Sequence, residues 1–240
     1  MSDKPRYIGI NQRVPIRILD HFIATYLATG EVDRTLLKLE MAGVYKGKNR
    51  SSKAAMYARK ILTYNTVSLQ FIRDTISVER YNNLSAPDKA ALIFSLIAEA
   101  YPIFHDVIEI MAKVYRVQKV VSRKYVFQKI SSLYGSNRTL VNALDAIFPM
   151  LFDIGFLIRE KPGVYRAVAG LELQDEKICE LYVACGIRLS GGKHISLEDF
   201  EYRDWHYFLK PKLPPYKNQK IIAVTLTGPR NGYVQCKKYG

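Results

Sequence analysis

Apolar residues recur three and four positions apart through the first half of the chain. The clearest run begins at Ile16, continues through Leu19, Phe22 and Ile23, and stops before Gly30. Residues at this spacing share one face of an α-helix, and glycine commonly follows a helix end. The same pattern predicts further helices over residues 36–41, 55–62, 67–76, 92–97 and 103–114. We therefore expect a helical bundle over residues 1–119, which begins with an extended arm over residues 1–14.

Small polar residues and glycine indicate where these helices start and stop. Gly43 is expected to end the second helix, and residues 45–50 (YKGKNR) form a basic loop. Ser51 or Ser52 can cap the helix after that loop. Ser85 and Asp88 form a variant of the capping box, in which a serine hydroxyl accepts a backbone N–H three residues on.

Residues 122–168 follow a different order of elements. A helix over 122–134 ends at Gly135, and a second helix, capped by Ser136 or Asn137, ends at Gly155. Two short strands, 156–160 and 164–168, then flank a Lys-Pro-Gly turn at 161–163. Helix, tight turn, helix, strand, turn and strand is the order of a winged helix-turn-helix, which we predict for residues 120–169.

The remaining residues, 170–240, mix helical and strand patterns. We expect a helix over 175–185, a short helix from Ser196 to Phe208, and a proline-rich connector over 210–216. Residues 221–227 and 232–236 predict a terminal β-hairpin. The predicted fold class is therefore mostly α (α+β): a helical bundle, a winged helix-turn-helix and a C-terminal α+β region.

Positive charge is concentrated in three parts of the chain. The 36 Lys and Arg residues outnumber the 22 Asp and Glu residues, for a net charge of +14. Residues 41–73, 110–144 and 205–240 contain no acidic residue, and each holds seven Lys or Arg residues. Segregated positive charge is typical of proteins that neutralise phosphates, although three solvated basic faces would give the same pattern.

The predicted winged helix supplies the first set of candidate DNA-binding residues. The second helix of such a motif places its N-terminal residues at base edges, where Arg and Asn can pair with purines. The candidates are Ser136, Asn137, Arg138, Thr139 and Asn142 on this helix, Arg159, Lys161 and Arg166 on the wing, and Arg123 and Lys124 at the start of the preceding helix. Asp145 and Pro149 in the same helix oppose this interpretation, because a carboxylate repels phosphate and a proline kinks a helix.

A second set of candidates lies in the basic loop and the helix after it. These cations are Lys46, Lys48, Arg50, Lys53 and Arg59. They could bind phosphates, or they could form an ordinary exposed basic surface.

The residues that could carry catalysis or bind a metal form no recognisable motif. Glu198, Asp199, Glu201, Asp204 and His206 could bind a metal as in nucleases, but their spacing does not place them on one face. His21 and His105 lie on apolar helices and are expected in or near the core. The three cysteines contain no CxxC pair, which argues against a zinc ribbon and fits a reducing compartment. We expect no enzyme activity, no metal and no cofactor.

No segment predicts a membrane protein. The longest apolar stretch, residues 90–104, is shorter than the roughly 20 residues that cross a bilayer. No apolar run follows the N-terminus as it would in a signal peptide. We expect a cytoplasmic protein that does not contact membranes.

Several stretches resemble the BrxA family of bacterial phage-exclusion (BREX) systems. They are residues 16–27, 49–62, 90–114, 136–140 and 153–157, and the resemblance covers about residues 15–168. It implies a non-enzymatic component of an anti-phage operon that binds double-stranded DNA, with other defence-system proteins as further partners. The implied contacts include Lys53, Arg59 and residues 136–139. Residues beyond Leu171 do not match the family pattern.

The sequence therefore predicts a non-catalytic protein that binds double-stranded DNA. The alternatives are an assembly scaffold whose basic faces dock an acidic protein partner, and a nuclease that uses residues 198–206.

Overall fold

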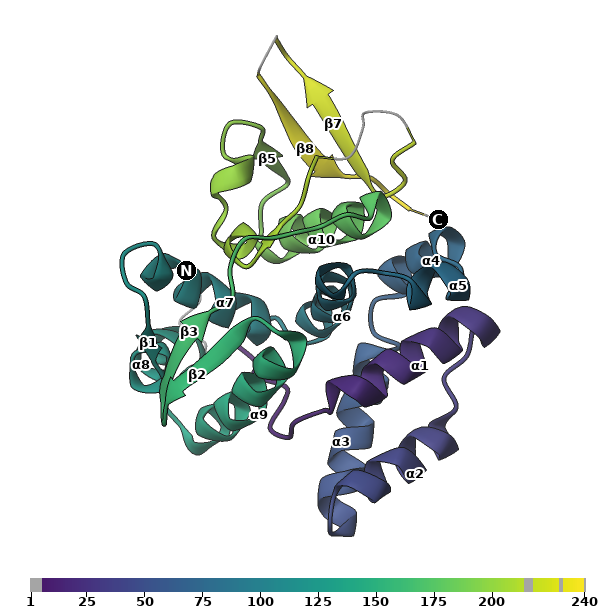
Figure 1. Cartoon of the computed structure of the whole chain (residues 1–240), viewed down its shortest axis with the longest axis vertical. Helices are drawn as coiled ribbons and strands as arrows, with labels where there is room; N and C mark the ends of the chain where they lie inside the picture. The colour runs from purple at the N-terminus through teal and green to yellow at the C-terminus, as the bar shows by residue number, and fades with distance from the viewer. Residues whose placement is uncertain (1–5, 214–217, 229–230, 240) are drawn as a thin grey trace.

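The computed structural model describes residues 6–213, 218–228 and 231–239. This part of the chain contains ten α-helices and three small β-sheets, so the protein is mostly helical with an α+β composition, as the sequence predicts (Figure 1). One hydrophobic core contains residues from the N-terminal helices, the middle segment and the C-terminal region.

The N-terminal helices surround α6, which is buried over most of its length (Figure 1). The seven helices of this region, α6 included, are α1 (Ile16–Thr29), α2 (Arg34–Val44), α3 (Lys48–Ile61), α4 (Thr66–Thr75), α5 (Val78–Asn82), α6 (Ala86–Ala100) and α7 (Ile103–Tyr115). The Ser85 hydroxyl accepts the Asp88 N–H, which confirms the predicted cap. Gly30 adopts the left-handed conformation that ends α1. Pro102 separates α6 from α7, and the two helices meet at a bend of 118°.

Two predicted helix boundaries in this region are wrong. Gly43 lies inside α2, which continues to Val44. Neither Ser51 nor Ser52 caps α3, because the helix already starts at Lys48 and Gly47 occupies the capping position with φ of 101°. Glycine tolerates this backbone conformation, so the chain can turn at Gly47 and α3 can begin at Lys48. The predicted basic loop over residues 45–50 is therefore only a short turn. The Ser51 hydroxyl donates to the Lys48 carbonyl, 3.1 Å away.

The middle segment has the predicted order of elements. It consists of β1 (Val121–Ser122), α8 (Arg123–Tyr134), α9 (Arg138–Ile154), β2 (Leu157–Lys161) and β3 (Val164–Ala167). The three strands form an antiparallel sheet in the order β1-β3-β2. α9 continues through Pro149, and Gly155 ends it in the left-handed conformation. Gly135 ends α8, as predicted, and also has a positive φ, but its ψ of 148° lies outside the left-handed helical region.

The C-terminal region packs through α10 (Glu176–Leu189) onto α6 (Figure 1). It also contains β4 (Leu171–Glu172), β5 (His194–Ser196), η1 (Phe200–Tyr202), η2 (Asp204–Tyr207), β6 (Leu209–Lys210), β7 (Ile222–Leu226) and β8 (Gly232–Cys236). β4 and β6 pair in parallel, and β5, β8 and β7 form an antiparallel sheet in that order. The predicted terminal hairpin is present as β7 and β8. Part of the predicted proline-rich connector, residues 214–217, lies outside the described residues.

The helix predicted from Ser196 to Phe208 is wrong. Ser196 belongs to a strand that pairs with Tyr233, and two short 3-10 turns follow. Long-range packing explains this result, because the Trp205 ring lies directly on α10 at Gly186, where a Cβ would come within 1.2 Å of it.

Among the described residues, no single helix has the length and apolar character needed to cross a membrane. α6 and α7 together have the length and composition, but they form the bent pair described above.

Candidate nucleic-acid interface

The start of α9 presents exposed polar side chains. The Asn137 side-chain oxygen accepts the Leu140 N–H at 3.0 Å, which caps the helix and fixes where it begins. Leu140, Ala143 and Leu144 are buried on one side of α9, so the opposite side faces solvent. The exposed candidates are Ser136, Asn137, Arg138, Thr139 and Asn142. Within the described residues, Arg138 has no carboxylate in ion-pair distance.

The hairpin of β2 and β3 lies beside α9, but its three cations differ in their surroundings. The Arg159 guanidinium lies over the Phe152 ring, 5.5 Å from its centroid. Arg166 pairs with Glu160 on the neighbouring strand, which neutralises its charge. Lys161 is exposed at the end of β2, next to the turn. Arg159 and Lys161 are therefore the hairpin cations without a carboxylate partner in the described part of the chain.

Arg123 and Asp145 form an ion pair between α8 and α9. Their nitrogen and oxygen atoms lie 2.8 Å apart, and the same nitrogen donates to the Val141 carbonyl at 3.3 Å. Asp145 is predicted to repel phosphate, but Arg123 compensates its charge. The same contact occupies Arg123, whereas the neighbouring Lys124 is exposed.

The second set of candidates lies on α3 and the turn before it. Lys46, Lys48, Arg50, Lys53 and Arg59 are all exposed. α3 packs against the bundle through Ala54, Ala55, Ala58 and Ile61, which turns its basic side outward. No acidic residue occupies its first turn, so Lys48 and Arg50 add to the positive end of the helix dipole.

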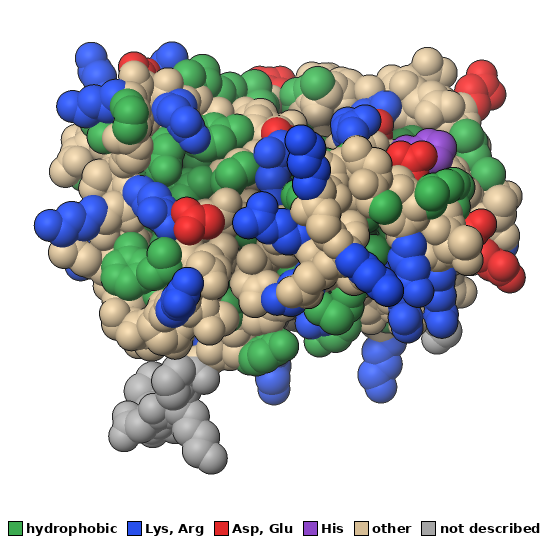
Figure 2. All heavy atoms as spheres, turned by 90° about the horizontal axis from the view of Figure 1, so that it is seen from below, with side chains coloured by type: hydrophobic (Ala, Val, Ile, Leu, Met, Phe, Trp, Pro, Cys, Tyr) green, Lys and Arg blue, Asp and Glu red, His purple; other side chains and the backbone are tan. Residues whose placement is uncertain are grey.

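The two sets come from different parts of the same side of the molecule. In Figure 1 the α2–α3 turn lies at the bottom, and α9 with its hairpin lies at the lower left. Figure 2, seen from below, shows many Lys and Arg side chains and fewer Asp and Glu side chains on this face. The arrangement presents an extended basic surface rather than one compact patch.

A groove lies between α1, α6 and the end of α9. It has a volume of about 740 Å³ and is lined mainly by apolar side chains, with charged groups at its rim. Asp153 on α9 pairs there with Arg13, which precedes α1. This ion pair connects the N-terminal arm to the middle segment.

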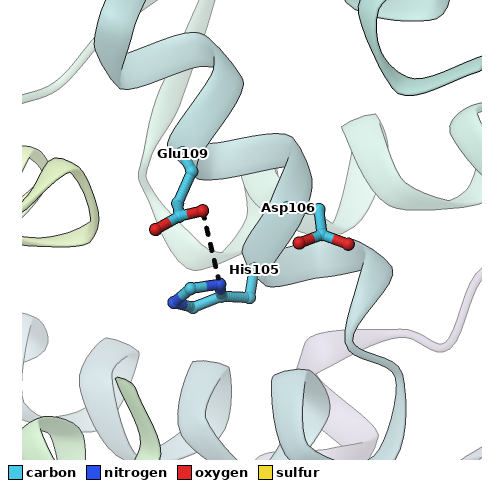
Figure 3. A group of neighbouring side chains, drawn as sticks. All are labelled: His105, Asp106 and Glu109. Carbon is cyan, nitrogen blue, oxygen red and sulfur yellow. Dashed lines mark ion pairs between the residues drawn. The ribbon is translucent and has the colours of Figure 1, made fainter. Parts of the chain in front are cut away.

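His105, Asp106 and Glu109 on α7 bring their ligand atoms within 4.8 Å of one another (Figure 3). His105 Nδ1 lies 4.0 Å from a Glu109 oxygen. Asp106 already accepts hydrogen bonds from Arg6 at 2.9 Å and from the Tyr134 hydroxyl at 2.6 Å. Both bonds go to Oδ2 of Asp106, so this carboxylate connects α7 to the N-terminal arm and to α8. The i, i+1, i+4 spacing of the three residues is a signal that the sequence analysis missed.

The residues 198–206, considered above as a possible metal site, do not come together in the structure. Asp204 pairs with Lys113 and Arg116, and His206 is buried with Nδ1 2.7 Å from the Phe200 carbonyl. Residues 198–206 therefore do not converge on one metal position. His105 is buried, as predicted, and burial lowers its pKa to about 4. His21 is exposed, so its predicted place in or near the core is wrong.

Comparison with models of protein families, with curated proteins and with solved structures finds no match for this chain.

Proposed function

We propose that this protein binds double-stranded DNA without catalysis of its own, and that residues 121–167 act as a winged helix-turn-helix. The observation that carries the proposal is the exposed, uncompensated start of α9 beside the β2–β3 hairpin. The antiparallel order β1-β3-β2, with α8 and α9 between β1 and β2, supports this assignment.

In the proposed complex the start of α9 enters the major groove. Arg138 and Asn142 can reach base edges, and Ser136 and Thr139 can donate to phosphates together with free backbone N–H groups. The Asn137 oxygen is occupied by its cap, so its amide can contribute donors only. Arg159 and Lys161 lie on the wing, where they can contact the DNA backbone.

The basic side of α3 provides a second contact in this proposal. Lys46, Lys48, Arg50, Lys53 and Arg59 are exposed, and none has an ion-pair partner among the described residues. Each phosphate that such a side chain neutralises releases counterions, which changes the salt dependence of log K by about −0.9. Binding is therefore expected to depend strongly on salt and weakly on sequence.

We also propose that the chain is a BrxA-like component of a bacterial anti-phage system. The stretches that carry the resemblance include α3 and the start of α9, which are the two exposed basic regions. Other defence-system proteins are expected partners. The C-terminal region, which packs on α6, is an addition to that pattern.

A binding titration with a blunt DNA duplex at two salt concentrations tests the proposal. Arg138→Ala should weaken binding by about 1–3 kcal/mol and relax any base preference, whereas Lys53→Ala should weaken it uniformly and flatten the salt slope. Lys193→Ala is the matched control, because it removes an exposed charge from the turn after α10. Salt-independent binding, or unchanged binding in both test variants, would contradict the proposal. Co-purification of an acidic protein without duplex binding would favour the scaffold alternative.

A further inference from the structure

The Lys60 ammonium at the end of α3 lies among three tyrosine rings. Its nitrogen is 4.7 Å from the ring centroid of Tyr101, 4.8 Å from that of Tyr64 and 6.0 Å from that of Tyr7. These distances are within the range in which an aromatic ring attracts a cation. The group joins α3 to the N-terminal arm and to the end of α6.

Two of the three rings are open to solvent. Tyr7 is 82% exposed and Tyr64 is 59% exposed, whereas Tyr101 is buried at 1%. Single exposed aromatic residues are common on protein surfaces and need no explanation. Two exposed tyrosines around one lysine are different, because they offer ring faces and a positive charge at the same place.

The buried Tyr101 holds this arrangement in position. Its ring packs edge-to-face on Tyr57 at 5.9 Å, and its hydroxyl donates to the Tyr57 carbonyl at 3.4 Å. Gly9 has φ of 76°, which turns the arm so that Tyr7 approaches Tyr101. A Cβ at Gly9 would lie only 3.1 Å from Tyr7 and 3.2 Å from Tyr101. The buried Tyr101 and the turn at Gly9 therefore place the Tyr7 ring near Lys60 before any ligand binds, which lowers the entropy cost of binding.

The charge of Lys60 is not compensated by an acid. No carboxylate within the described residues lies in ion-pair distance of it. Burial among the rings lowers its pKa from the ordinary lysine value. A partly desolvated ammonium without a counterion is a good partner for an anion such as phosphate.

α3 extends the same surface toward the duplex-binding residues. Lys53 and Lys60 are seven residues apart, so they lie along one side of α3, and Tyr64 follows just after the helix end at Ile61. Lys48 and Lys60 are roughly 18 Å apart along the axis, from the rise per residue of a helix. The tyrosines thus end a basic stripe that begins at the α2–α3 turn.

We propose that Tyr7, Lys60 and Tyr64 bind an unpaired nucleotide of a single-stranded nucleic acid. The base stacks on an exposed tyrosine ring, and the phosphate contacts Lys60. Rings beside cations are the combination that single-strand binding proteins use, and a paired base inside a duplex would not present its face. The inference rests on the proposed function, because the unpaired strand is expected to continue from a duplex bound along α3.

The test uses the full chain with a blunt duplex and with the same duplex carrying a single-stranded overhang. We expect tighter binding of the overhang, and 5-iodouracil placed in it should cross-link to Tyr7 or Tyr64 under ultraviolet light. Tyr7→Leu and Tyr64→Leu should each weaken overhang binding by about tenfold and leave blunt-duplex binding unchanged. Lys60→Gln should weaken overhang binding more than blunt-duplex binding, because it also removes a cation of α3. Tyr202→Leu is the matched control, because Tyr202 is 72% exposed in the C-terminal region. Overhangs of DNA and of RNA with the same sequence show which of the two nucleic acids is preferred.

The outcomes separate this inference from the proposed function. Equal binding of overhang and blunt duplex by the wild-type chain, or full overhang binding in the tyrosine variants, overturns the inference even if Arg138 is needed for duplex binding. Binding of single strands that requires Tyr64, without any duplex binding, supports the inference and overturns the proposed function. A tyrosine variant that loses affinity for both probes also overturns the inference, once thermal unfolding shows that it is folded.

Discussion

Arg123 at the start of α8 and Asp145 in the middle of α9 form an ion pair with a 2.8 Å contact. This pair lies beside the proposed recognition surface and compensates its acidic residue. About a third of the Arg123 side chain and three fifths of the Asp145 side chain remain exposed, so the pair contributes under about 1 kcal/mol to stability. Its main effect is on the electrostatic potential near the start of α9.

Asp145→Asn is therefore expected to strengthen duplex binding. The substitution frees Arg123 and removes a negative charge, so affinity should rise roughly threefold and the salt slope should steepen by about 0.9. A fluorescence anisotropy titration at several salt concentrations measures both. Asp153→Asn, on the same helix but paired with Arg13, is the control and should change binding less. An equal effect of the two substitutions would show that only net charge matters.

Two substitutions of Asn137 distinguish its role in capping α9 from the proposed contact of this helix start with DNA. Asn137→Ala removes the acceptor for the Leu140 N–H and should lower the free energy of unfolding by about 1 kcal/mol. Asn137→Asp keeps a capping oxygen, so stability should be retained, but its carboxylate should weaken duplex binding. Urea unfolding and a binding titration test the two effects. If Asn137→Asp binds duplex as tightly as the wild type, the start of α9 does not face phosphates.

The buried Glu180 is expected to hold the C-terminal sheet on α10. One carboxylate oxygen accepts backbone N–H groups of Lys220, Ile221 and Ile222, and the other accepts from Lys177 at 3.1 Å. Glu180→Ala leaves these buried donors unpaired and should cost about 3–5 kcal/mol. Hydrogen exchange should accelerate in β7. The exposed Glu176 on the same helix provides the control substitution to Ala, and equal protection of β7 in the two variants would contradict this role.

Acid should destabilise the contact between α7 and the C-terminal region. Burial lowers the pKa of His105 to about 4 and that of His206 to about 3, below the unfolded value of 6.5. The unfolded state therefore takes up protons first, so stability is complete above about pH 6.5 and falls as the pH drops toward the folded pKa values. The loss is on the order of 1.4 kcal/mol per histidine for each unit of pH in that window.

Urea unfolding at about pH 7 and about pH 5 measures this loss. His105→Phe keeps a ring against Trp205, which His105 meets edge-on at 5.3 Å, and should reduce the pH dependence. An unchanged dependence in this variant would show that other groups dominate the acid response.

Features that depend on local hydrogen bonds and on residue spacing can be predicted from the residues alone. Ser85 and Asn137 cap helices that their own chain segments form, and Gly30 and Gly155 end helices in the left-handed conformation. The pattern also identified the terminal hairpin. These features were predictable because each residue acts on partners within a few positions.

Which charged groups remain uncompensated depends on how the helices and strands pack together. Arg123 meets Asp145 from another helix, and Arg166 meets Glu160 across a strand pair, whereas Arg138 stays unpaired within the described residues. The tertiary structure also places the rings of Tyr7 and Tyr64 beside the Lys60 ammonium. A strand at Ser196 and 3-10 turns after it stand in place of the predicted helix. Contacts between residues far apart in the chain decide the Arg123–Asp145 pair, the approach of Tyr7 to Lys60 and the strand at Ser196. A local pattern of polar and apolar positions does not contain the energies of these contacts.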